Sequence, residues 1–172
     1  MPAYRPINLS EIALKGLLGV AVAGGAVLPL APSLANAASV RKEFVVEAPP
    51  AFVWEALRDF GAVDKRLARG FVVSSRLEGE ARVIVFANGS EARELLVDLD
   101  DDALRLVYSA VSPRLLAHSA SAQLFPEDGN RTRFVWTADF LPNDLKPYID
   151  GQMEAGAAAM KKTLEEDTAS AP

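Results

Sequence analysis

The sequence contains no cysteine and only one histidine among its 172 residues. The absence of cysteine excludes disulfide bonds, thiolate metal sites and a cysteine nucleophile. Carboxylates remain as metal ligands, but the run of Asp98, Asp100, Asp101 and Asp102 is interpreted as a solvated turn, because a calcium loop needs ligands at fixed alternation together with a glycine bend. The chain also has no glycine-rich phosphate loop and no nucleophile elbow. We therefore expect no metal and no cofactor.

A basic surface is also lacking, because 18 Lys and Arg face 23 Asp and Glu and the net charge is −5. Binding to nucleic acid requires a basic face that replaces the counterions of the phosphates, and anionic membrane surfaces attract the same kind of face. We expect neither nucleic acid as a partner nor stable membrane association of the mature protein. Half of the residues are hydrophobic and 24% are charged, which is the balance of one globular domain rather than of a disordered chain.

The N-terminal segment has the layout of a secretory signal. Arg5 and Lys15 precede residues 16–35, which carry no charge, and the segment ends in the small-x-small pattern Ala35-Asn36-Ala37. The alternative is an anchor that stays attached, but glycine and proline residues within the apolar run disfavour a spanning helix. We expect residues 1–37 to be a cleaved signal peptide and residues 38–172 to form one domain that is periplasmic or secreted.

The first part of the mature chain predicts a strand followed by short helices. Residues 40–48 are rich in strand-forming side chains and end at Pro49-Pro50. Pro50 is suited to the first position of a helix, in which Val53, Trp54 and Leu57 recur at helical spacing. A second short helix over residues 62–67 is a weaker prediction.

From Phe71 the apolar pattern changes to six extended runs, separated by turn residues. The Asn88-Gly89 pair between two of these runs is a strong hairpin signal. Because the connections are too short for parallel crossovers, the strands should form an antiparallel meander. The predicted strands cover residues 71–79, 81–87, 91–100, 103–110, 116–125 and 131–140.

The last part of the chain predicts a long amphipathic helix that ends near Glu166. Its apolar stripe, at spacings of three and four, consists of Leu145, Ile149, Met153, Ala157, Met160 and Leu164. Antiparallel strands with helices at either end indicate an α+β domain, in which this helix covers one face of the sheet.

Several short motifs, in this order, are similar to those of one superfamily. They include Phe44–Pro49 leading into Val53-Trp54, Arg58–Gly61, Ser74–Gly79, Leu106–Tyr108 and Arg131–Trp136. Across residues 39–166 the chain resembles the START-like (SRPBCC) superfamily, and most closely its polyketide cyclase/dehydrase-type bacterial members. The resemblance implies the helix-grip fold, in which a curved seven-stranded antiparallel sheet wraps around the C-terminal helix with a cavity between them.

Strand alternation assigns side chains to the face that looks toward this helix. The inward sets are Leu104, Leu106, Tyr108 and Ala110; His118, Ala120, Ala122 and Leu124; and Phe134, Trp136, Ala138 and Phe140. In the strand over residues 91–100 the parity is ambiguous. Leu95, Val97 and Leu99 look inward, but this choice also turns Arg93 inward and Glu94 outward.

Small residues are predicted to face each other between the sheet and the helix. Ala120, Ala122 and Ala138 would lie opposite Gly156 and Ala157, and this arrangement either closes the two layers together or leaves a void. The resemblance favours a void, which makes it a predicted pocket for an apolar small molecule. The expected ligand-binding residues are Tyr108, His118, Ala120, Ala122, Phe134, Trp136, Ala138, Met153, Gly156, Ala157 and Met160.

Three functions are compatible with these features. The leading hypothesis is an exported binding protein for an apolar or aromatic, lipid-like molecule. The second is a cyclase/dehydratase-like enzyme that uses His118 and Tyr108 as acid and base groups. A lone histidine without a local carboxylate partner makes the enzyme the weaker hypothesis. The third is a periplasmic accessory protein without a pocket, which binds a protein partner through a sheet edge.

Overall fold

A computed structural model describes residues 36–170, so the predicted signal sequence up to residue 35 lies outside the described residues. The order of elements is the one that the sequence predicts. The elements are β1 (Ala38–Val46), α1 (Pro50–Arg58), the π-helical turn η2 (Val63–Leu67), β2 (Val72–Glu78), β3 (Ala81–Phe86), β4 (Glu91–Asp100), β5 (Arg105–Val111), β6 (Ala117–Glu127), β7 (Arg131–Leu141), the 3₁₀ turn η3 (Asn143–Leu145) and α2 (Lys146–Ala169).

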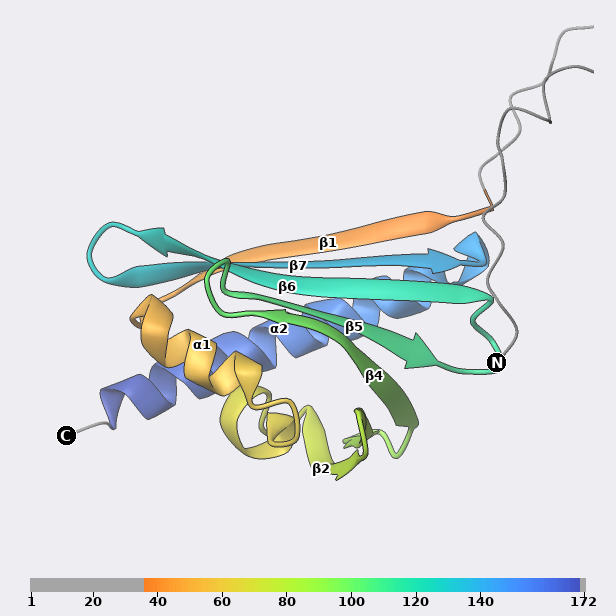
Figure 1. Cartoon of the computed structure of the whole chain (residues 1–172), viewed down its shortest axis with the longest axis horizontal. Helices are drawn as coiled ribbons and strands as arrows, with labels where there is room; N and C mark the ends of the chain where they lie inside the picture. Colours follow the sequence, from red (N-terminus) through yellow and green to blue (C-terminus); the bar gives the residue numbers. More distant parts are fainter. Residues whose placement is uncertain (1–35, 171–172) are drawn as a thin grey trace, which may run out of the picture. The chain divides into compact units, whose positions relative to one another are not determined.

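The seven strands form one antiparallel sheet in the order β1-β7-β6-β5-β4-β3-β2. The last strand, β7, pairs with the first, β1. In this pair Phe44 lies opposite Phe134, and the centroids of the two stacked rings are 5.0 Å apart. Figure 1 shows α2 running along one face of β1, β7, β6 and β5, while β4 and β2 bend away toward the side of α1. The predicted helix-grip fold is therefore confirmed.

A β-bulge resolves the ambiguous parity of β4. The register shifts between Leu96 and Asp98, so one extra residue, Val97, stands in the strand. Ala92, Glu94 and Leu96 before the bulge and Leu99 after it share the inner face. Leu99 lies inward as expected, but the prediction for Leu95 and Val97 is wrong, because these side chains are 39% and 61% exposed. Simple alternation fails here since the bulge reverses it.

Helix α1 is tied to the sheet through the acidic turn that follows β4. Val53, Trp54, Ala56 and Leu57 are buried on one side of the helix. The indole N–H of Trp54 donates to Asp101, 2.8 Å away, and the Asp100 carboxylate accepts the backbone N–H groups of the turn. These aspartates therefore serve as local hydrogen-bond acceptors that fix the turn.

Helix α2 buries the predicted apolar stripe against the concave face of the sheet. Leu145, Met153, Met160 and Leu164 are buried, and Ile149 packs against the core. Thr163 joins the stripe and accepts the Arg69 backbone N–H at 3.1 Å. Within residues 36–170, no helix combines the length and the apolar character that crossing a membrane requires.

Gly156 meets aromatic rings rather than alanines, which corrects the predicted contact of small residues with small residues. A Cβ atom at Gly156 would lie 3.0 Å from the Trp136 ring and 3.2 Å from the Phe71 ring. The rings of Trp136 and Phe71 therefore occupy the space next to Gly156 in which the sequence analysis placed alanines of the sheet. Glycine at this position therefore allows α2 to approach Trp136.

This contact predicts opposite effects for two glycines of the same helix. Gly151→Ala adds a methyl group in open space, so the better helix propensity of alanine should raise the free energy of unfolding by up to about 1 kcal/mol. Gly156→Ala should lower it, because the new methyl group presses on Trp136 and Phe71. Urea denaturation of the two variants measures the difference, and equal stabilisation by both would contradict the close contact.

Candidate functional site

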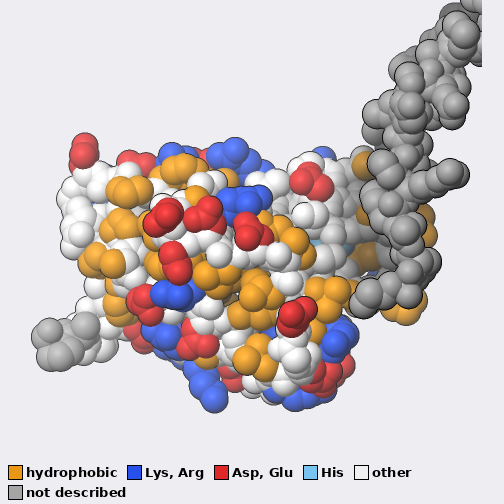
Figure 2. Space-filling view, in the orientation of Figure 1, with side chains coloured by type: hydrophobic (Ala, Val, Ile, Leu, Met, Phe, Trp, Pro, Cys, Tyr) orange, Lys and Arg blue, Asp and Glu red, His pale blue; other side chains and the backbone are white. Residues whose placement is uncertain are grey.

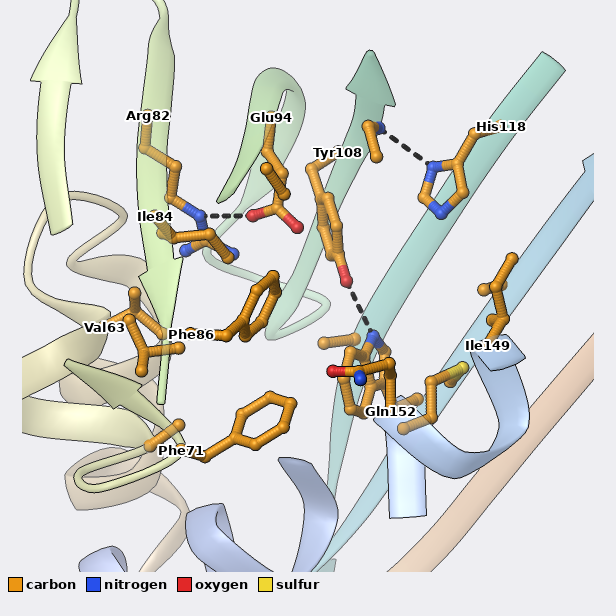
Figure 3. A pocket seen from close by; sticks show the side chains of 18 of the residues that line it. Val63, Phe71, Arg82, Ile84, Phe86, Glu94, Tyr108, His118, Ile149 and Gln152 are labelled. Carbon is orange, nitrogen blue, oxygen red and sulfur yellow. Dashed lines mark hydrogen bonds and ion pairs between the residues drawn. The ribbon is translucent and has the colours of Figure 1, made fainter. Parts of the chain in front are cut away.

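A cavity of about 330 Å³ lies between the concave face of the sheet and α2, which is within the range of small-molecule sites. Most of its wall is apolar. Leu57, Val63 and Leu67 close one end, and Ile84, Phe86 and Leu106 come from the sheet. Figure 3 shows Phe71 and Phe86 on one side and Ile149 and Gln152 of α2 on the other.

Eight of the eleven predicted ligand-binding residues line this cavity: Tyr108, His118, Ala122, Phe134, Trp136, Ala138, Met153 and Met160. Their role in binding stays a prediction. Ala120, Gly156 and Ala157 do not line it. Ala120 is 1% exposed between Tyr108 and Ala138 in the ladder, and Gly156 packs against Trp136. These three residues pack the layers around the cavity instead of bounding it.

The sequence analysis missed a buried ion pair in the cavity wall. Arg82 on β3 and Glu94 on β4 stand directly opposite each other, with Nε and Oε2 2.6 Å apart and side chains only 8% and 9% exposed. The guanidinium also donates to the Phe60 carbonyl at 3.1 Å and lies 4.1 Å above the Phe60 ring. The pair places two opposite charges beside an otherwise apolar space.

The hairpin signal at Asn88-Gly89 does not by itself give the register of this pair. In the ladder, Ile84 faces Ala92 and Arg82 faces Glu94, a register centred on Asn88. A two-residue Asn88-Gly89 turn would pair Arg82 with Leu95. The observed pairing needs the three-residue loop 87–89, which is closed by the Phe86 N–H that donates to the Ser90 carbonyl. The sequence analysis placed Glu94 on the outer face because it turned the apolar side chains of Leu95 and Val97 inward.

Tyr108 presents a neutral hydroxyl to the cavity. Its side chain is buried, and its oxygen accepts the indole N–H of Trp136 at 3.0 Å. Burial raises the pKa of Tyr108 far above its usual range, and the charge of Glu94 raises it further. The phenol is therefore a hydrogen-bond donor at any physiological pH.

The side chain of His118 replaces a backbone hydrogen-bond acceptor at the point where β5 and β6 separate. Their ladder ends at Tyr108 opposite Ala120; beyond it, the Ala110 N–H donates to His118 Nδ1 at 2.9 Å and the Ser109 hydroxyl donates to the His118 carbonyl. Burial lowers the pKa of His118 despite the opposing charges of Glu94 and Asp139. The ring is neutral, and its proton is on Nε2 because Nδ1 is an acceptor.

At the mouth of the cavity the side chains are more exposed. The Arg114 guanidinium, from the β5–β6 connection, lies 5.6 Å from the centre of the Tyr148 ring on α2, and Glu91 also lines the opening. Over the face shown in Figure 2, basic and acidic side chains are interspersed with apolar patches. This face offers no broad surface of one charge.

The model of the family described as polyketide cyclase / dehydrase and lipid transport matches residues 37–166. The chain belongs to this family. No curated protein sequence matches the chain.

Solved structures share the fold of this polyketide cyclase / dehydrase and lipid transport member at low sequence identity. Protein XoxI from Bacillus cereus has a TM-score of 0.66 and 17% identity, over 77% of this chain and 96% of that one. A solution structure from Thermobifida fusca has a TM-score of 0.62 and 29% identity, over 74% and 93%. A point mutant of norcoclaurine synthase from Thalictrum flavum, bound to a transition state analogue, has a TM-score of 0.61 and 15% identity, over 76% and 96%.

The geometry separates the three functional hypotheses. The cavity contradicts the absence of a pocket that the accessory-protein hypothesis assumed, whereas its protein partner stays a prediction. His118 reaches the cavity, as an enzyme would need, but no carboxylate of the described residues bonds to it. With its proton on Nε2, the ring offers a donor to the cavity rather than a base.

The ion pair predicts unequal costs for breaking buried and exposed pairs. Glu94→Leu leaves the Arg82 guanidinium buried without its anionic partner and should lower the free energy of unfolding by about 3–5 kcal/mol. The double variant Arg82→Met/Glu94→Leu should recover most of this loss. Glu78→Ala, which breaks an exposed pair with Arg93, should cost less than about 1 kcal/mol. Chemical denaturation measures all three, and no recovery in the double variant would contradict the assignment.

The His118 environment predicts a pH-dependent stability. Because folding lowers the pKa of His118, its contribution is complete above the unfolded pKa of about 6.5 and is lost as the pH falls from there toward the folded pKa. Denaturation curves between pH 8 and pH 5.5 should show this loss. His118→Asn keeps an acceptor for Ala110 and cannot be protonated, so its profile should be flatter. Identical profiles would contradict the prediction.

Proposed function

We propose that the chain is an exported binding protein that holds an apolar or aromatic small molecule between its sheet and α2. The observation that carries this proposal is the cavity of about 330 Å³, whose wall is mainly apolar and holds a few buried polar groups. That combination is typical of sites in which apolar contact supplies affinity and a few polar contacts orient the ligand.

The polar groups support ligand binding because their hydrogen-bonding capacity is incomplete. Gln152 Oε1 is buried and has no donor within the described residues. The Tyr108 hydroxyl accepts one bond from Trp136 and donates none. Buried polar groups are normally paired, so free ones in a cavity wall suit a ligand or bound water.

The family and one structural neighbour support the same proposal. The family description names lipid transport beside cyclase and dehydrase activity. The norcoclaurine synthase mutant has a similar fold and was solved with a small molecule bound. Fold similarity alone does not choose between carriage and catalysis. The neutral His118, with Nδ1 occupied by Ala110, favours carriage.

Export rests on the sequence of the N-terminal segment. The uncharged run over residues 16–35 and the Ala35-Asn36-Ala37 exit support cleavage after Ala37. Strand β1 begins at Ala38, so this cut would leave the sheet complete.

Native mass spectrometry of the protein from its own host tests both parts of the proposal. The protein mass should correspond to residues 38–172, and a second species should carry the mass of an apolar ligand that organic solvent removes. Ala122→Leu, which fills the cavity from β6, should reduce the ligand-bound fraction at least tenfold. Ser119→Leu, on the exposed face of the same strand, is the control and should retain the ligand. Ligand retention by a folded Ala122→Leu protein would argue against this cavity as the site.

A further inference from the structure

Tyr108 and His118 each present a hydrogen-bond donor for which the described residues supply no acceptor. The indole N–H of Trp136 can only donate, so the Tyr108 oxygen acts as acceptor in their 3.0 Å bond. The hydroxyl proton must then point elsewhere. Tyr108 is buried and lines the cavity, so this proton is directed to the interior rather than to bulk water.

The His118 donor follows from the same argument. Its Nδ1 accepts the Ala110 N–H at 2.9 Å, which leaves the proton on Nε2. No residue between 36 and 170 accepts a bond from this nitrogen. In Figure 3 the ring edge opposite Nδ1 is turned toward the space between Tyr108 and Ile149.

The two donors are close enough to serve one ligand group. The Tyr108 and His118 ring centroids are 6.0 Å apart, the planes are inclined by 42°, and both rings line the same cavity. A carbonyl oxygen has two lone pairs and can accept from both donors at once. An ammonium group could satisfy neither of them, and a neutral amine, with its single lone pair, could accept from only one.

The charges around the donors distinguish a neutral oxygen from an anionic one. Arg82, the buried cation of the cavity wall, is already paired with Glu94 at 2.6 Å. The charge of the Glu94 carboxylate acts to raise the pKa of both Tyr108 and His118, so it also disfavours a second negative charge beside them. Arg114, the other guanidinium in the lining, is exposed and lies over Tyr148. No unpaired buried cation is present among the described lining residues to balance a carboxylate.

We infer that the ligand is an uncharged, mainly apolar molecule with a carbonyl group, whose oxygen accepts hydrogen bonds from the Tyr108 hydroxyl and the His118 Nε2–H. This inference rests on the proposed function, since it names the polar group of the molecule that the cavity binds. The apolar wall of Ile84, Phe86 and Leu106 takes the rest of the ligand.

Three probes of nearly identical shape test the inference by isothermal titration calorimetry. They are 2-acetylnaphthalene, 2-isopropenylnaphthalene, in which a CH₂ group replaces the oxygen, and 2-naphthoate, which carries a negative charge. The ketone should bind at least tenfold more tightly than the alkene, and the carboxylate should bind most weakly. Tyr108→Phe and His118→Asn should each reduce the preference for the ketone several-fold and leave the affinity for the alkene unchanged. Thr137→Val, which removes a hydroxyl on the outer face of β7, is the control and should keep the full preference.

An infrared measurement distinguishes direct hydrogen bonds from indirect effects of the substitutions. The carbonyl stretch of the ¹³C-labelled ketone should shift to lower frequency on binding, and each of the two variants should reverse part of this shift. Circular dichroism confirms that the variants fold.

The outcomes separate the inference from the proposed function. Equal affinities for ketone and alkene, unaffected by the variants, would overturn the inference and leave binding of apolar molecules intact. Tightest binding of 2-naphthoate would overturn it in favour of an anionic ligand. Failure of all three probes to bind the folded protein would overturn the proposed function together with the inference.

Discussion

The contact of Trp136 with α2 sets the distance between helix and sheet on which the cavity depends. The indole ring lies against Gly156, where even a methyl group would be crowded, and its N–H bonds to Tyr108. The helix therefore cannot move closer to β7 without displacing the ring. Beside Trp136, the short side chains of Ala122 and Ala138 do not fill the space that it holds open. A large residue next to small ones thus produces a cavity that uniform packing would close.

The buried pair of Arg82 and Glu94 adds polarity to this cavity without net charge. Such pairs contribute little to stability, because the desolvation of both ions offsets their attraction. Their effect here is on the neighbouring groups: the charge of Glu94 adds to the effect of burial in raising the pKa of Tyr108, and it opposes the effect of burial on the pKa of His118. A cavity with neutral donors beside a compensated ion pair is suited to recognising uncharged polar groups. The same arrangement is poorly suited to a general base at His118, whose Nδ1 is occupied by Ala110.

Side-chain alternation predicted the inner face correctly wherever a strand is regular. In β6 and β7 the inward positions of His118, Ala122 and Trp136 follow from alternation alone, and all three line the cavity. The method failed in β4, where the bulge at Val97 reverses the pattern and where Glu94 was assigned to the wrong face. The opposed positions of Arg82 and Glu94 depend on a three-residue loop centred on Asn88, and the Asn88-Gly89 signal alone does not specify that loop length.

The sequence by itself determined the order of elements, the antiparallel meander and the apolar stripe of α2, because periodicity and turn residues are local properties. It also placed Tyr108 and His118 on the inner face. Only the tertiary structure decided that Gly156 meets Trp136, that Phe71 closes the cavity, and that the Tyr108 oxygen is an acceptor for an indole. These facts depend on how far apart two packed layers stand and on which side chains meet across them. Neither property is encoded in the spacing of residues along one strand or helix.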